Sequence, residues 1–198
     1  MLLISISRRN LSAKKLDKKK KIIEEYNSSA KIYEKRYKKI QNYKFWLLIK
    51  NLIFKSGIYL DAGSGTNLFL DYINKERIAR NIRLIGLDIS LNMLKIAKKK
   101  QKNTYLILGD IENLPFKSNL FTGFISITSF QNLPDIKKGI EEINRVFRRN
   151  GLLAITILKK SFNLNEVKKL FQPYFQELNF IQDIKCEDWI IFKNIKEN

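Results

Sequence analysis

Beyond residue 55 the chain alternates short, almost purely apolar runs with longer amphipathic stretches, and this alternation limits its fold more than any other feature. Strands are expected at residues 58–60, 84–89, 105–108, 121–129, 152–158, 180–184 and 189–193, and helices at residues 68–78, 91–100, 134–149 and 163–171. Asn150–Gly151 should end the third of these helices as a turn. Runs this apolar suit strands covered on both faces. The pattern predicts an α/β fold with a doubly wound, mostly parallel seven-stranded sheet.

The segment before this alternation has a different composition. Residues 8–50 hold fifteen Lys or Arg and four acids, a net charge of about +11, and no Gly or Pro lies between residues 14 and 55. Four residues recur at steps of four, three and four, which places them on one face of a helix: Tyr26, Ala30, Tyr33 and Tyr37. We predict a basic helical N-terminal arm or cap over residues 1–55 and a core domain over residues 56–198.

Two further features of this arm bear on how it packs. Ile22 and Ile40 roughly extend the face that carries the tyrosines. The lysine run Lys18–Lys21 is expected to form a solvated face of the helix or a frayed beginning.

The chain is strongly basic, with 38 Lys and Arg against 19 Asp and Glu and a net charge of +19. Such a charge attracts polyanions such as RNA, although a lysine-rich composition alone would also produce it. The chain has no histidine and a single cysteine, Cys186, so an intrachain disulfide is excluded and no metal site is expected. No apolar run approaches the about 20 residues of a membrane span, and Met1–Ile4 is too short for a signal peptide. We therefore expect a soluble cytoplasmic protein.

A glycine loop follows the first expected strand and precedes a helix; it reads Asp61-Ala62-Gly63-Ser64-Gly65. Glycine lets the backbone turn sharply and approach a ligand closely, and a loop at the carboxyl end of a strand faces the ligand crevice of an open α/β sheet. A dinucleotide fingerprint needs glycine where Leu68 stands, and a P-loop needs Gly-Lys-Ser/Thr. The loop is therefore a site for another ligand or a tight strand-to-helix turn.

Two acids follow the next two strands. Asp88, 23 positions after Gly65, could accept hydrogen bonds from ribose hydroxyls or cap the next helix, although Ser90 can also serve as the cap. Asp110 could accept from an adenine amino group, with Ile111 on the adenine face, or belong to an ordinary turn. Acids after three successive strands favour a nucleoside ligand over three unrelated turns.

These three sites resemble the class I S-adenosylmethionine (SAM)-dependent methyltransferase family, specifically its small-molecule branch related to quinone-biosynthesis methyltransferases. The family pattern acid-x-Gly-x-Gly-x-Gly is matched except at Asn67, a residue type that tolerates left-handed backbone angles. A further departure is Thr122, which stands where Asp is usual. The resemblance covers residues 26–160 well and implies a Rossmann-like fold with an N-terminal helix over the cofactor.

The resemblance implies SAM as the cofactor and gives roles to the matching residues. The backbone around Gly63 and Gly65 would hold the methionine part, with Asp61 near its ammonium group. Asp88 would bind the ribose and Asp110 the adenine. The other cofactor contacts implied are Ala62, Ser64, Ile89, Met93, Ile111 and Ser129.

The acceptor side is expected where the fourth strand ends and under the N-terminal helix. The residues predicted there are Tyr26, Tyr33, Phe130, Gln131 and Asn132, although the tyrosines could simply pack the helix. We predict no particular catalytic residue, because transfer of a methyl group from a sulfonium mainly needs orientation and a dry pocket.

We therefore expect an enzyme, a SAM-dependent methyltransferase that acts on a small molecule. An RNA methyltransferase would use the basic arm to bind phosphates, and its affinity for RNA would fall steeply with salt. A non-catalytic SAM-binding module would be consistent with the departures at Asn67 and Thr122.

Overall fold

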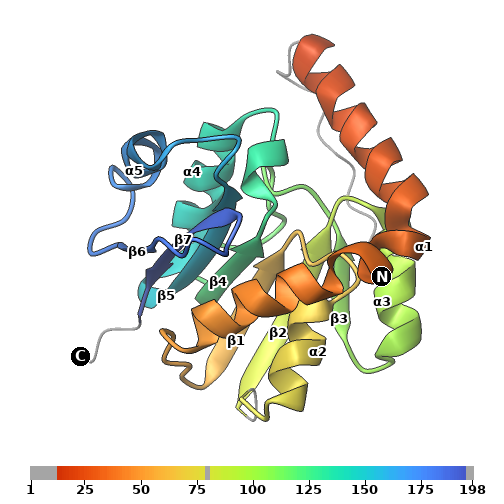
Figure 1. The fold of residues 1–198 in the computed structure, drawn as a ribbon, viewed down its shortest axis with the longest axis horizontal. Coiled ribbons are helices and arrows are strands. Elements are labelled where there is room, and N and C mark those ends of the chain that lie inside the picture. The colour runs from red at the N-terminus through yellow and green to blue at the C-terminus, as the bar shows by residue number, and fades with distance from the viewer. Residues whose placement is uncertain (1–12, 79–80, 195–198) are drawn as a thin grey trace.

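The computed structural model describes residues 13–78 and 81–194 and contains one seven-stranded sheet with helices on both faces (Figure 1). The strands are β1 (Gly57–Ala62), β2 (Ile82–Asp88), β3 (Tyr105–Leu108), β4 (Phe121–Ile127), β5 (Phe147–Leu158), β6 (Asn179–Ile181) and β7 (Asp188–Lys193). Their order in the sheet is β3-β2-β1-β4-β5-β7-β6. The first five strands run parallel, whereas β7 pairs antiparallel with β5 and β6 antiparallel with β7. The predicted fold class is confirmed.

The helices are α1 (Ala13–Ile49), α2 (Leu68–Lys75), α3 (Leu91–Lys100), α4 (Ile136–Val146) and α5 (Leu164–Phe171), with a 3-10 turn, η1 (Phe130–Asn132). Two apolar layers enclose the sheet. On one face α4 and α5 pack against β1, β4 and β5, for example through Ile143 and Phe171. On the other face α1 and α2 pack on the same strands, for example through Leu48 and Ile73. Covering both faces explains why the strands lack polar positions.

The prediction of a helix over residues 134–149 and a turn at Asn150–Gly151 was wrong from residue 147 onward. The helix ends at Val146, and Asn150–Gly151 lie inside β5 instead of forming a turn. Phe121 of β4 pairs with Phe147, but Gly123 pairs with Leu152, so the two strands change register between these pairs. The extra residues of β5 are accommodated as a bulge, which a reading of local turn residues does not reveal.

Helix α1 has two parts that do different things. Its C-terminal part supplies Phe45, Leu47 and Leu48 to the core, and Figure 1 shows a bend between that part and the N-terminal turns. The hydroxyls of Ser28 and Ser29 both donate to the carbonyl of Glu25, a pattern that commonly bends helices. Within the described residues no helix is long and apolar enough to cross a membrane; Met1–Ile4 lie outside them.

Candidate functional site

The glycine loop is held against β2 by backbone hydrogen bonds. The amides of Gly63 and Ser64 both donate to the carbonyl of Leu87, at 2.7 and 3.0 Å. Gly63 and Gly65 have φ angles of 82° and 54°, in the left-handed region that favours glycine. A Cβ on Gly63 would lie 2.1 Å from the Ser129 hydroxyl oxygen. The loop therefore needs glycine both for its backbone angles and for space.

Neither departure from the family pattern disturbs this loop. Asn67 has φ 64°, so it adopts the left-handed conformation that the missing glycine would have supplied. Thr122 lies at the amino end of β4, where its side chain sits against Gly57 at the start of β1. That is the edge of the sheet opposite the glycine loop, so Thr122 does not take part in the site.

Asp88 fixes the glycine loop from the end of β2. One carboxylate oxygen accepts from the amide of Gly65 at 2.7 Å and the other from the amide of Ser90 at 2.8 Å. Ser90 caps α3 through its own hydroxyl, which accepts from the amide of Met93. The capping role therefore belongs to Ser90. Burial raises the pKa of Asp88 to about 6 because it disfavours the charged form.

Asp61, at the end of β1, is buried and incompletely paired. Its Oδ2 atom has no hydrogen-bond partner among the described residues. Burial, with a smaller contribution from the charge of Asp88, raises the pKa of Asp61 to about 8. No Lys or Arg of the described part of the chain lies within 4 Å of either carboxylate. This end of the site therefore holds two buried carboxyl groups without a counter-cation from the described residues.

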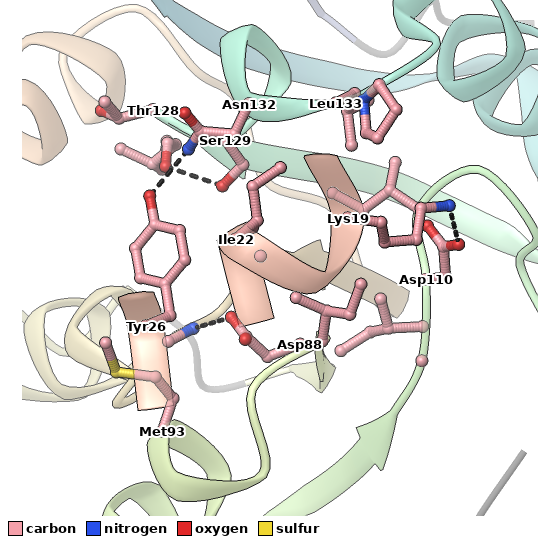
Figure 2. A pocket seen from close by; sticks show the side chains of 18 of the residues that line it. Lys19, Ile22, Tyr26, Asp88, Met93, Asp110, Thr128, Ser129, Asn132 and Leu133 are labelled. Atoms are coloured by element: carbon pink, nitrogen blue, oxygen red, sulfur yellow. Dashed lines mark hydrogen bonds and ion pairs between the residues drawn. The ribbon is translucent and has the colours of Figure 1, made fainter. Parts of the chain in front are cut away.

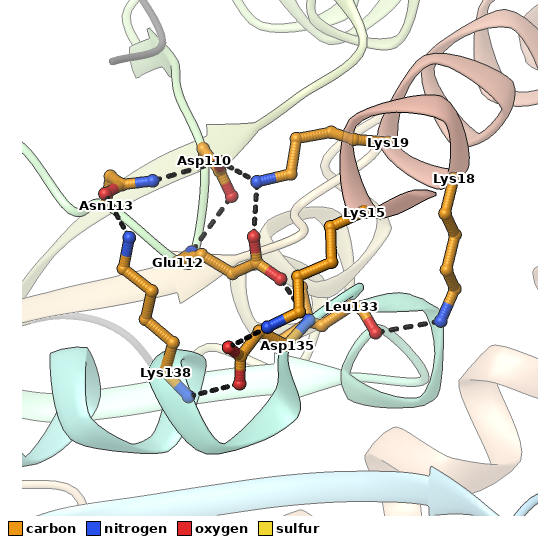
Figure 3. Close-up of polar contacts among 9 residues, drawn as sticks. All are labelled: Lys15, Lys18, Lys19, Asp110, Glu112, Asn113, Leu133, Asp135 and Lys138. Atoms are coloured by element: carbon orange, nitrogen blue, oxygen red, sulfur yellow. Dashed lines mark hydrogen bonds and ion pairs between the residues drawn. The ribbon is translucent and has the colours of Figure 1, made fainter. Parts of the chain in front are cut away.

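Asp110, after β3, is in the opposite situation (Figure 3). Its Oδ2 atom lies 2.5 Å from the ammonium of Lys19, which also contacts Glu112. All three side chains are almost completely buried. The expectation that Lys18–Lys21 is a solvated face or a frayed end is wrong for Lys19, because two buried acids after β3 attract its charge into the interior.

Two neighbouring lysines bind the same region of the chain. The ammonium of Lys15 pairs with Asp135 at 2.7 Å, and that of Lys18 donates to the carbonyl of Leu133 at 2.9 Å. The spacing of residues in the sequence indicates which side of α1 contacts the core here, although the lysine-rich composition makes this hard to recognise. Lys15, Lys19, Ile22 and Tyr26 follow one another at steps of four, three and four, the same spacing that placed the tyrosines on one face.

The three acidic sites border two small adjoining cavities. The first, of about 70 Å³, is lined by predicted residues, among them Tyr26, Tyr33, Gly63, Gly65, Asp88, Ile89, Met93, Asp110, Ile111, Ser129 and Asn132. Figure 2 shows Ile22, which the sequence did not single out for the site, projecting from α1 into its middle. The second, of about 30 Å³, shares Gly63 and Gly65 and adds Asp61, Ser64 and Gln41. Ala62 lines neither and is buried in the core.

A larger cavity of about 650 Å³ adjoins the first and shares Tyr26, Tyr33, Thr128 and Asn132 with it. Gln131 also lines this cavity, which we call the acceptor cavity. Four of the five residues predicted for the acceptor therefore lie on its wall. The fifth, Phe130, is fully buried and packs against Phe171 in the core, with ring centroids 5.9 Å apart.

Tyr26 and Tyr33 of α1 are packed in the protein, and their hydroxyls can still form hydrogen bonds. The hydroxyl of Tyr26 accepts from the side-chain amide of Asn132 at 2.7 Å, which ties α1 to the end of β4. Burial raises the pKa of Tyr33 to about 12 and that of Tyr26 further. Both hydroxyls therefore remain protonated near neutral pH and can donate hydrogen bonds but cannot act as bases.

Thr128 is a strained residue between the cavities that the sequence did not reveal. Its φ of 54° is unusual for a β-branched residue. Its hydroxyl donates to buried Asp188 at 2.7 Å, and Asp188 pairs with buried Lys44 of α1 at 2.8 Å. Strain of this kind persists only when surrounding contacts enforce it, and it is common at functional sites.

Comparison with known proteins agrees with this geometry. The family model described as a methyltransferase domain matches residues 60–155, which run from β1 into β5 and include all three acidic sites. The chain belongs to the class I SAM-dependent methyltransferase family. One relative of the chain, the uncharacterized protein MJ1123 of Methanocaldococcus jannaschii, is 31% identical over 173 residues, or 79% of this chain and 80% of that protein.

A second relative, the demethylmenaquinone methyltransferase of Thermotoga maritima, is 34% identical over 59% of this chain and 50% of that enzyme. The chain also covers 51% of MJ1252 of M. jannaschii, so it spans about half the length of these two curated relatives. A SAM-dependent methyltransferase from Aquifex aeolicus has the same fold, with a TM-score of 0.68 at 17% identity over 84% of this chain and 96% of that one. The resemblance stated from the sequence is confirmed.

Proposed function

We propose that this protein transfers a methyl group from SAM to a small-molecule acceptor. The observation that supports it best is the unpartnered, buried Oδ2 of Asp61 beside the glycine loop. Asp88 lies nearby, and no Lys or Arg within residues 13–78 and 81–194 lies within 4 Å of either carboxyl group. SAM, when bound, supplies a methyl group on a positively charged sulfur, and its methionine end carries an ammonium group. The charge and hydrogen-bonding capacity of these residues suit such a ligand.

Each acid has a distinct part in this proposal. Asp61 binds the ammonium group, and the backbone around Gly63 and Gly65 holds the rest of the methionine part. Asp88 keeps the loop in place through its two amide contacts and uses its remaining lone pairs for the ribose hydroxyls. Asp110 accepts from the adenine amino group, while Ile111 lies against the base.

The size of the site requires a movement of α1. The first cavity measures about 70 Å³, whereas ligand sites usually have roughly 300–1,000 Å³. Lys19 and Ile22 occupy the space beside Asp110 and in the middle of the cavity (Figure 2). We infer that the N-terminal turns of α1 shift outward when the cofactor binds, about the bend near Ser28 and Ser29.

The acceptor cavity supports a small molecule as the second substrate. Its volume of about 650 Å³ lies within the usual range for such ligands, and it shares Thr128 and Asn132 with the first cavity. Tyr26 and Tyr33 can donate hydrogen bonds there, and we assign no residue as a base. The basic arm favours RNA less than composition suggested, because Lys15, Lys18 and Lys19 are bound to this chain itself.

The test is to incubate the protein with SAM labelled in its methyl group and with cell extract, and then to separate small molecules, protein and RNA. An Asp88→Asn variant, prepared in parallel, is the control for background transfer. Label in the small-molecule fraction that depends on Asp88 would support the proposal. Label in the RNA fraction would mean that the acceptor is RNA and not a small molecule. Binding of S-adenosylhomocysteine without transfer to any fraction would favour a non-catalytic module.

A further inference from the structure

Several buried side-chain oxygens around the glycine loop have no hydrogen-bond partner among the described residues, among them Gln41 Oε1, Asp61 Oδ2 and Ser64 Oγ. All three residues line the same cavity of about 30 Å³. Unpaired buried polar atoms are unfavourable, and several around one cavity indicate a missing partner. Asp61 and Ser64 belong to the glycine loop, but Gln41 comes from the C-terminal part of α1.

Gln41 is poorly explained by packing alone. Its side chain is 6% exposed, and Phe45 and Phe69 line the same cavity. The amide nitrogen lies 3.5 Å from the hydroxyl of Tyr33, which is a long and weak contact. An apolar residue would fill this position at lower cost unless the carbonyl oxygen has a partner in the working protein. Gln41 also lines the acceptor cavity, so it stands where the two cavities meet.

A positively charged partner suits this cavity best. An ammonium group brings three donors, enough for Asp61, Gln41 and one further acceptor. It would also stabilise the ionised forms of Asp61 and Asp88, which no Lys or Arg in the described ranges approaches within 4 Å. A trapped water would satisfy the oxygens but would not stabilise the ionised carboxylates in this way.

We propose that Gln41 of α1 binds the α-ammonium group at the methionine end of the cofactor, together with Asp61. This inference rests on the proposed function, because it takes SAM as the ligand. Helix α1 then supplies part of the cofactor site in addition to covering it. Gln41 would then contact the methionine end of the cofactor and also line the acceptor cavity.

The experiment compares two ligands by calorimetry. S-adenosylhomocysteine has the amino-acid end, whereas 5′-methylthioadenosine lacks it but keeps the adenosine and the sulfur. Gln41→Leu should weaken S-adenosylhomocysteine by roughly 10- to 100-fold, since a hydrogen bond to a charged group is lost. The affinity for 5′-methylthioadenosine should stay within about twofold, because the contacts at the adenosine end are unchanged. Asn42→Leu, one residue along the same helix and facing an open groove beside Tyr43, is the matched control.

Thermal unfolding without ligand gives a second readout. Gln41→Leu removes an unpaired oxygen from the interior, so its melting temperature should equal or exceed that of the wild type. If Gln41→Leu does not fold, Gln41→Met serves instead, because its flexible side chain fills irregular space.

An unchanged affinity for S-adenosylhomocysteine, or equal weakening of both ligands, would overturn the role of Gln41 while leaving the proposed function intact. A wild-type protein that binds neither ligand would refute the proposed function itself. The two failures are therefore distinguishable in one set of titrations.

Discussion

Asp110 and Asp61 are buried acids at the same edge of one sheet, but among the described residues only Asp110 has a cation beside it. At the proposed adenine end Lys19 crosses from α1 and binds Asp110 and Glu112. At the proposed methionine end Asp61 keeps an unpartnered oxygen, and the pKa of its carboxyl is raised to about 8. Lys19 supplies a cation to one of these acids, whereas no Lys or Arg of the described residues supplies one to the other.

Because of this difference, we expect Asp110 to contribute mainly to stability and Asp61 mainly to ligand binding. A buried carboxylate that already has its cation contributes to folding, and removing the partner is costly. A buried carboxylate without a cation destabilises the ligand-free protein, and binding a cationic ligand recovers that energy. The two ends should therefore respond in opposite ways to substitution, which the following predictions exploit.

The largest effect is expected from Lys19→Met. It would leave Asp110 and Glu112 buried without a cation, so the free energy of unfolding should fall by about 3–5 kcal/mol in urea denaturation. Lys20→Met, an exposed neighbour on the same helix, should change it by less than about 0.5 kcal/mol. Equal stability of the two variants would mean that Lys19 is not buried in solution.

Next in size is the effect of Asp88→Ala on ligand binding. The variant loses the two amide contacts that hold Gly65 and Ser90 as well as the proposed ribose contacts. Affinity for S-adenosylhomocysteine should fall by roughly 100-fold, the equivalent of two or more hydrogen bonds to a charged group. Calorimetry measures it, with Asp71→Ala of α2 as the comparison acid. An affinity within threefold of the wild type would contradict the cofactor assignment.

A smaller effect, of opposite sign, should follow from Asp61→Asn. The folded protein holds a proton on Asp61 up to about pH 8, whereas the unfolded chain releases it near pH 4, so the ligand-free wild type loses stability as pH rises through this window. Asp61→Asn does not titrate in this window and lacks that loss. The free energy of unfolding of the variant, relative to that of the wild type, should therefore be at least about 1–2 kcal/mol higher at pH 9 than at pH 6.5. Urea denaturation at the two values tests it, and Asp88, with a pKa of about 6, contributes little between them.

The smallest effect is expected at the rim of the adenine end. Lys15 and Asp135 form an ion pair whose side chains are 42% and 28% exposed. Lys15→Ala should therefore lower the free energy of unfolding by less than about 1 kcal/mol, and raising the salt concentration should shrink the difference further. A loss as large as that of Lys19→Met would show that burial does not set the ranking of these contacts.

Much of the fold and half of the site could be predicted from local sequence. Apolar runs marked the strands because strands covered on both faces need no polar positions. Gly63, Asp88 and Asp110 each follow such a run, so their place at one edge of the sheet follows from the parallel topology. Local signals failed at Asn150–Gly151, where a bulge in the pairing of β4 with β5 overrode turn propensity.

The tertiary structure alone decided what α1 contributes. Its helical state follows from spacing, and spacing also places Lys19, but not its exposed neighbour Lys20, on the face of the tyrosines. Nothing in the sequence shows which acids Lys19 meets, or that Gln41 meets Asp61 at one cavity. Secondary structure depends on periodicity, which is local. Burial of a charge or an amide depends on which distant groups it meets, and only the packing of α1 across the sheet determines that.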